Sequence, residues 1–138
     1  MTKPNEQYAY FSITGSFDPA DITARVGVEP TECWRQGDLN PRNRLGRKFS
    51  RWCLYSRLSR ERELEAHVRD VLSQLDARRE AFRQAAGEFD GSMQLVGYFY
   101  TGYPGLHFER DVVKEMAAFG LSIDFDFYEL YSDRREDT

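Results

Sequence analysis

The sequence has few of the residues from which metal centres, disulfide frameworks and membrane spans are built. Its 138 residues include two histidines and two cysteines, Cys33 and Cys53. It has no Cys-x-x-Cys or His-x-x-x-His spacing, no glycine-rich phosphate loop and no Gly-x-Ser-x-Gly motif. It also lacks a run of about 18 apolar residues, which a transmembrane helix requires. We therefore expect a cytoplasmic chain with free thiols, without a metal or other cofactor, and without a membrane partner.

The residues that are present suffice for one core. Apolar residues make up 41% of the chain and aromatic residues 14%, in a length typical of a single domain. The formal net charge of −4 argues against a nucleic-acid partner, because nucleic-acid binders usually have a basic excess. Segment 35–49 is the exception, since its only acid is Asp38 and its basic residues are Arg35, Arg42, Arg44, Arg47 and Lys48. Loops of this length and polarity are usually functional or mobile.

Residues 92–131 predict a strand, a turn, a helix and a second strand. Segment 92–100 is rich in aromatic and branched residues, and 111–119 has helical spacing that ends at Gly120. Segment 121–127 alternates apolar and polar residues, as a half-buried strand does. This stretch gives the clearest indication of fold class in the chain.

An earlier part of the chain has a similar order. Residues 7–14 alternate as a strand, Asp18 is placed to cap a helix, and Gly27 is placed to end it. Further strands are predicted at 28–34 and 50–56. Two strand-helix-strand units side by side predict one α+β domain, ordered from about residue 7 to residue 131. We expect a ferredoxin-like two-layer sandwich, with four to five mostly antiparallel strands, helices on one face and a frayed tail at 132–138.

One long helical region is predicted between the two units. Residues 60–86 carry buried-face residues at helical spacing, with Ser59 as its N-cap. Asp76 is a point at which this helix can break and restart.

Several short segments, in this order, resemble a known family. They are ITARVGVEPT at 22–31, WRQGD at 34–38, Trp52, PGLH at 104–107 and GLSIDFDFY at 120–128. The chain resembles the bacterial family described as domain of unknown function (DUF) 4279 over nearly its whole length. The resemblance implies a small bacterial cytoplasmic domain, and it carries no activity, cofactor or catalytic residue to this chain.

One candidate site is a small-ligand site. An indole can stack on a planar or cationic group, and an arginine can hold a carboxylate or phosphate with two hydrogen bonds. The candidate residues are Trp34, Arg35, Gly37, Asp38, Trp52 and His107. The alternative, which we favour, is that the indoles pack in the core and at the sheet edge while Arg35 pairs with Asp38. Cys33 and His107 could form a nucleophile and its base only if the fold brings them together.

The other candidate is the sheet face turned away from the helices. Tyrosines provide large contact areas at low entropic cost and are common at protein interfaces. Strand alternation predicts that this face carries Tyr8, Tyr10, Tyr98, Tyr100, Asp124, Asp126 and Tyr128, with Arg51 and Tyr55 as further members. The two aspartates could also suit acid-base or metal chemistry, but no third ligand lies nearby in the sequence. We therefore predict no catalytic residues.

The leading hypothesis is a non-enzymatic interaction module that binds a protein partner. The partner could be a second copy of the chain, and an immunity-type role would fit by analogy of size and acidity. The alternative is a small-ligand-binding protein or a modest enzyme, with a site near Trp34, Arg35, Trp52 and His107.

Overall fold

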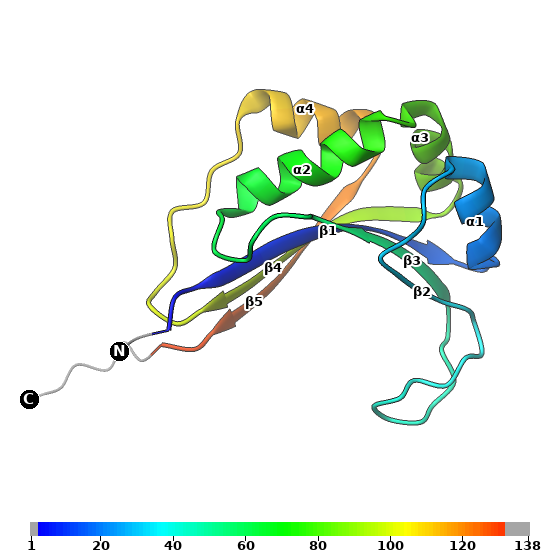
Figure 1. Cartoon of the computed structure of the whole chain (residues 1–138), viewed down its shortest axis with the longest axis horizontal. Helices are drawn as coiled ribbons and strands as arrows, with labels where there is room; N and C mark the ends of the chain where they lie inside the picture. Colours follow the sequence, from blue (N-terminus) through cyan, green and yellow to red (C-terminus); the bar gives the residue numbers. More distant parts are fainter. Residues whose placement is uncertain (1–2, 132–138) are drawn as a thin grey trace, which may run out of the picture.

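The computed structural model describes residues 3–131 (Figure 1). The strands are β1 (Glu6–Gly15), β2 (Glu32–Trp34), β3 (Ser50–Tyr55), β4 (Asp90–Phe99) and β5 (Ser122–Glu129). The helices are α1 (Pro19–Val26), α2 (Leu64–Asp76), α3 (Arg79–Glu88) and α4 (Arg110–Ala118). The strands form one sheet in the order β2-β3-β1-β4-β5, and the helices lie on one side of it (Figure 1). The tail predicted at 132–138 lies outside the described residues.

The predicted α+β class is confirmed, whereas the ferredoxin-like topology is not. β1 pairs antiparallel with β3 and β4, and β3 pairs antiparallel with β2, but β4 and β5 run parallel. Residues 100–109 and α4 carry the chain back over the sheet, so that β5 starts at the same end as β4. The two units that look alike in sequence therefore pair differently. β5 lies beside β4, whereas β3 separates β2 from β1.

Single residues set the ends of the first helix as predicted. Asp18 caps α1, since its Oδ1 accepts a hydrogen bond from the Ala20 amide at 3.0 Å. Gly27 has a left-handed φ of 71° and donates to the Thr23 carbonyl, which ends the helix. The long helical region is two helices, which break just after Asp76. Its first helix starts at Leu64 rather than near residue 60, because Ser59 caps a preceding turn by accepting from the Glu61 amide.

The core lies between the sheet and the helices, and Trp52 is at its centre. Trp52 and Phe11 from the sheet and Phe82 from α3 are fully buried, with ring centroids 5.5–6.2 Å apart. The Trp52 Nε1 donates to Thr23 Oγ1 at 3.0 Å, which satisfies the one polar atom of the indole. Trp52 therefore belongs to the core and is not available to a ligand. No helix within residues 3–131 is long and apolar enough to cross a membrane.

We predict that Trp52→Ala lowers the free energy of unfolding by about 3–5 kcal/mol, because it leaves a cavity and removes the hydrogen bond from the indole to Thr23. Chemical denaturation followed by circular dichroism measures this. Trp34→Ala is the matched control, since its half-buried indole lies outside the core, and it should cost about 1 kcal/mol or less. Equal losses for the two variants would contradict this assignment.

Candidate functional site

A row of tyrosines crosses the face of the sheet that the helices leave bare. We use the name tyrosine row for Tyr55 of β3, Tyr8 and Tyr10 of β1, Tyr98 of β4 and Tyr128 of β5. Tyr10 and Tyr55 stack with centroids 4.3 Å apart and ring planes 5° apart, and Tyr98 and Tyr128 stack at 4.9 Å. The first four rings are half-buried, and Tyr128 is 42% exposed. The row is thus an apolar stripe with hydroxyl groups, open to solvent across four strands.

Two half-buried phenol groups of this row, those of Tyr8 and Tyr55, are held in their neutral form. Burial is the main cause that raises the pKa of Tyr8 to about 12, and the neighbouring Tyr98 adds to it. Burial also raises the pKa of Tyr55, and the Glu32 carboxylate beside it adds to the effect. At neutral pH the row therefore presents hydroxyl donors and uncharged ring faces.

Segment 35–49, which we name the arm, is an ordered element that projects on the same side as the tyrosine row (Figure 1). Its two halves are joined by backbone hydrogen bonds from Gly37 to Arg47, from Arg47 to Asp38 and from Asn40 to Leu45. The Asn40 side chain also accepts from the backbone amide of Arg42. The arm therefore holds its side chains in place below the sheet.

The structure divides the predicted ligand residues between the two faces of the sheet. Cys33 is opposite Trp52 and Trp34 is opposite Arg51, so the two indoles point to different sides. The Arg35 guanidinium lies 3.2 Å from Asp18, whereas Asp38 accepts a hydrogen bond from the Arg35 backbone amide. The expected pairing of Arg35 with Asp38 is therefore not an ion pair: Asp38 binds the Arg35 backbone, and the Arg35 guanidinium pairs with Asp18.

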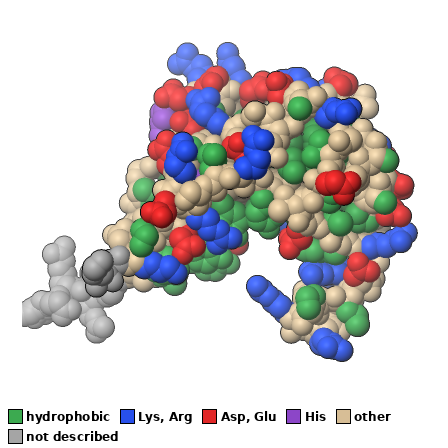
Figure 2. Space-filling view, in the orientation of Figure 1, with side chains coloured by type: hydrophobic (Ala, Val, Ile, Leu, Met, Phe, Trp, Pro, Cys, Tyr) green, Lys and Arg blue, Asp and Glu red, His purple; other side chains and the backbone are tan. Residues whose placement is uncertain are grey.

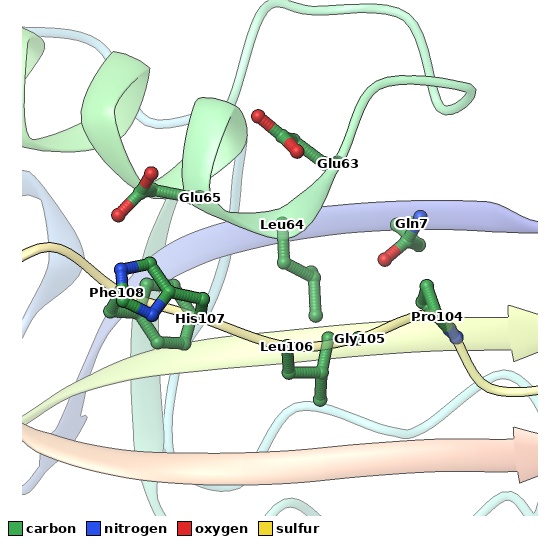
Figure 3. A pocket seen from close by; sticks show the side chains of 9 residues that line it. All are labelled: Gln7, Glu63, Leu64, Glu65, Pro104, Gly105, Leu106, His107 and Phe108. Carbon is green, nitrogen blue, oxygen red and sulfur yellow. The ribbon is translucent and has the colours of Figure 1, made fainter.

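His107 belongs to the connection between β4 and α4, and this connection runs at the opposite end of the molecule from β2 (Figure 1). It lines a cavity of about 170 Å³ with Gln7, Glu63 and Glu65, and its side chain is 72% exposed (Figure 3). Its Nε2 lies 3.3 Å from Glu109. His107 therefore joins neither Trp34 nor Cys33, and the six predicted ligand residues do not form one site.

Arg47 and Arg51 also lie on this face, although neither was among the predicted ligand residues. The Arg47 guanidinium stacks on Trp34, with its Cζ 3.7 Å from the ring centroid. Arg51 donates from Nε to Ser12 and lies 5.7 Å from the Tyr10 ring. A cavity of about 380 Å³ separates the arm from the sheet and is lined by Glu32, Trp34, Asn40, Pro41, Arg42, Arg47 and Tyr55. Strand alternation predicted Arg51 on this face, and the basic composition of 35–49 was the signal in the sequence for Arg42 and Arg47.

The elements described above lie within the segment that one family model matches. A family model described as Domain of unknown function (DUF4279) matches residues 5–130. The chain belongs to this family. Comparison with curated proteins and with solved structures found no match. The predicted resemblance to DUF4279 is thus confirmed, and the function has to be argued from the geometry of the domain.

One of the two edge strands of this DUF4279 domain is β5, whose helix side carries exposed apolar residues. Phe125 is 61% exposed and Ile123 39%. On the other side, Asp124 accepts from the Gln94 amide at 2.6 Å and Asp126 accepts from the Tyr128 hydroxyl at 3.2 Å. No cluster of three metal-ligating side chains occurs within residues 3–131. Charges on an edge strand discourage pairing with another strand, which gives both aspartates a structural role.

The raised tyrosine pKa values predict a loss of stability at alkaline pH. In the unfolded chain these phenols ionise near pH 10, whereas Tyr8 in the folded chain ionises near pH 12. The free energy of unfolding should therefore fall as the pH rises from 10 to 12. Urea denaturation across this range measures the fall, which should become shallower in Tyr8→Phe and again in Tyr8→Phe/Tyr55→Phe. An unchanged slope in both variants would refute the assignment. In these variants the free energy of unfolding should still fall somewhat with pH, because burial also raises the pKa of the Cys53 thiol to about 11.

Neutralising the two β5 aspartates should promote self-association through the free edge. We expect Asp124→Asn/Asp126→Asn to give a larger apparent mass at high concentration, measured by light scattering after gel filtration. The control is Glu29→Gln/Glu61→Gln, which removes the same charge from exposed positions outside the sheet edge. Equal association in the two double variants would show that net charge alone is responsible.

Proposed function

We propose that the chain is a non-enzymatic interaction module that holds a partner protein against its tyrosine row. The observation that carries this proposal is the row itself: five phenol rings from four strands, stacked in pairs, on a face that no helix covers. Rigid aromatic rings with a polar tip are the side chains most enriched at the energetic centres of protein interfaces. The pre-ordered row would therefore lose little entropy on binding.

The titratable groups that could support catalysis are not assembled for it. Cys33 and His107 lie on different sides of the molecule, and burial raises the pKa of the Cys33 thiol, which disfavours the nucleophilic thiolate. Asp124 and Asp126 each accept a hydrogen bond from a neighbouring side chain. These observations favour a binding role over an enzymatic one.

The charges on the face favour a protein over a nucleic acid. Aromatic sheet faces also bind single strands of nucleic acid, but those faces combine stacking with an excess of positive charge along the strand. Here Asp124 and Asp126 lie at the β5 end of the tyrosine row, where they would repel a phosphate backbone that follows the whole row. A protein surface of mixed charge meets no such penalty.

Substitutions in the tyrosine row should abolish partner binding without unfolding the chain. We expect Tyr98→Ala and Tyr128→Arg each to weaken binding by about tenfold or more, as loss of an interface aromatic does. Light scattering tests for a second copy as the partner. Affinity capture from the source cell, with identification of the bound protein, tests for a different one.

Phe125→Ala is the matched control, because it removes an exposed aromatic from the opposite face of β5, the strand that carries Tyr128. Wild-type binding by this variant, together with loss in the tyrosine variants, would support the proposal. A strictly monomeric chain that captures no protein, or one whose capture is unaffected in the tyrosine variants, would refute it.

A further inference from the structure

Positive charge is distributed unequally between the two sides of the sheet. Five arginines on the helix side are matched by acids, in the pairs Arg25–Glu88, Arg57–Asp70, Arg69–Asp111, Arg79–Glu115 and Arg83–Glu80. Within residues 3–131, no carboxylate lies within ion-pair distance of the basic side chains at 42, 44, 47, 48 and 51, all in the arm or beside it on β3. Five unmatched cations of a chain with a net charge of −4 thus gather around one hollow, whereas the others within residues 3–131, Arg62, Arg78, Arg110 and Lys114, lie outside the arm and the sheet.

The geometry of the arm directs two of these arginines at the tyrosine row. Arg42 and Arg47 both line the cavity that Tyr55 and Trp34 close from the sheet side. Arg42 lies near enough to Tyr128 to lower the pKa of that phenol, although the hydrogen bond to Asp126 raises it overall. Figure 2 shows the hollow below the sheet, with hydrophobic side chains above it and Lys or Arg side chains on the arm.

Arg47 stacks on Trp34 but forms no ion pair with a carboxylate of residues 3–131. Its Nε is buried and finds no acceptor among the described residues, and its flat face is covered by the indole. Stacking on an aromatic ring fixes the plane of a guanidinium and leaves its outer N–H edge for a carboxylate.

We propose that the hollow between the arm and the tyrosine row binds an acidic segment of the partner protein. Carboxylates of that segment pair with Arg42 and Arg47, and its apolar or aromatic side chains lie on the tyrosine row. This inference rests on the proposed function and names the chemistry of the partner.

The acids of the face do not oppose such a segment at the arm. Asp38 already accepts the Arg35 backbone amide, and the Glu32 carboxylate lies 3.4 Å from the Tyr55 hydroxyl, which donates to it. Asp124 and Asp126 are on β5, at the far edge of the sheet, and each already accepts a hydrogen bond, from Gln94 and from Tyr128. Unmatched charges at the arm also steer an acidic partner toward the hollow, an effect that salt weakens.

The test is titration of the full chain with a short synthetic peptide that alternates Glu and Tyr, with binding measured by calorimetry. The comparison peptide alternates Lys and Tyr. We expect the acidic peptide to bind at least about tenfold more tightly, and Arg42→Ala and Arg47→Ala each to weaken it by about tenfold. Arg110→Ala is the matched control, since it removes an exposed arginine on α4 that forms no ion pair within residues 3–131. Circular dichroism checks that the arm variants fold, and Arg42 makes no side-chain hydrogen bond that its loss would break.

The outcomes separate this inference from the proposed function. Equal binding of the two peptides, absence of binding, or wild-type affinity in both arm variants would overturn the acidic assignment. If Tyr10→Ser then weakened both peptides, the sheet face would stand as a protein-binding surface without acidic selectivity. If Tyr10→Ser changed neither, the proposed function would fail as well. Displacement of the acidic peptide by an equal concentration of inorganic phosphate, or tighter binding of oligothymidylate, would also overturn the inference.

Discussion

The structure depends on the alternation of side chains along β1, the strand at the centre of the sheet. Ala9, Phe11 and Ile13 are fully buried beneath the helices, while Tyr8 and Tyr10 point to the bare face. Because the period is two residues, a shift of one residue would place the tyrosines in the core and the apolar residues in solvent. The apolar side therefore sets the register, and the register in turn assembles the tyrosine row.

The arm illustrates a second constraint, which is that backbone hydrogen bonds can position charges without neutralising them. Backbone hydrogen bonds around the Leu39–Gly46 bridge hold the arm in shape without ion pairs from Arg42, Arg44 or Arg47. Exposed ion pairs such as Arg83–Glu80 on α3 add little stability, and the fields of their two opposite charges cancel at a distance. Unpaired cations held by the backbone instead retain their field, which suits them to recognition.

Local rules were sufficient wherever one residue or one period decides the structure. Asp18 and Gly27 set the ends of α1 as expected, and alternation alone placed Tyr10 and Tyr98 on one face. The parallel pairing of β5 was beyond such rules, because the edge that a strand joins depends on where its crossover packs. Family membership was accessible from short motifs, although no function came with it.

The residues that meet at the candidate site were likewise only partly predictable from local sequence rules. Trp34 and Trp52 looked equivalent in the sequence, and the register of β2 against β3 was needed to show that they lie on opposite faces. Arg47 reaches Trp34 from thirteen positions along the chain, a spacing that matches no motif. Only the excess of basic residues in 35–49 pointed to this contact, and composition identifies a segment without identifying the ring on which an arginine will stack.

The separation of the two faces also argues that the tyrosine row is not explained by folding. The core is closed by residues such as Trp52 and Phe82 on the helix side, and the tyrosine row lies outside this cluster. A sheet face that met only water could carry threonine or lysine at the same positions without partly burying phenols and displacing the pKa of Tyr8. The aromatic rings are concentrated on the sheet face that no helix covers, and they face the arginines of the arm that form no ion pair. These features are typical of a surface that binds a partner.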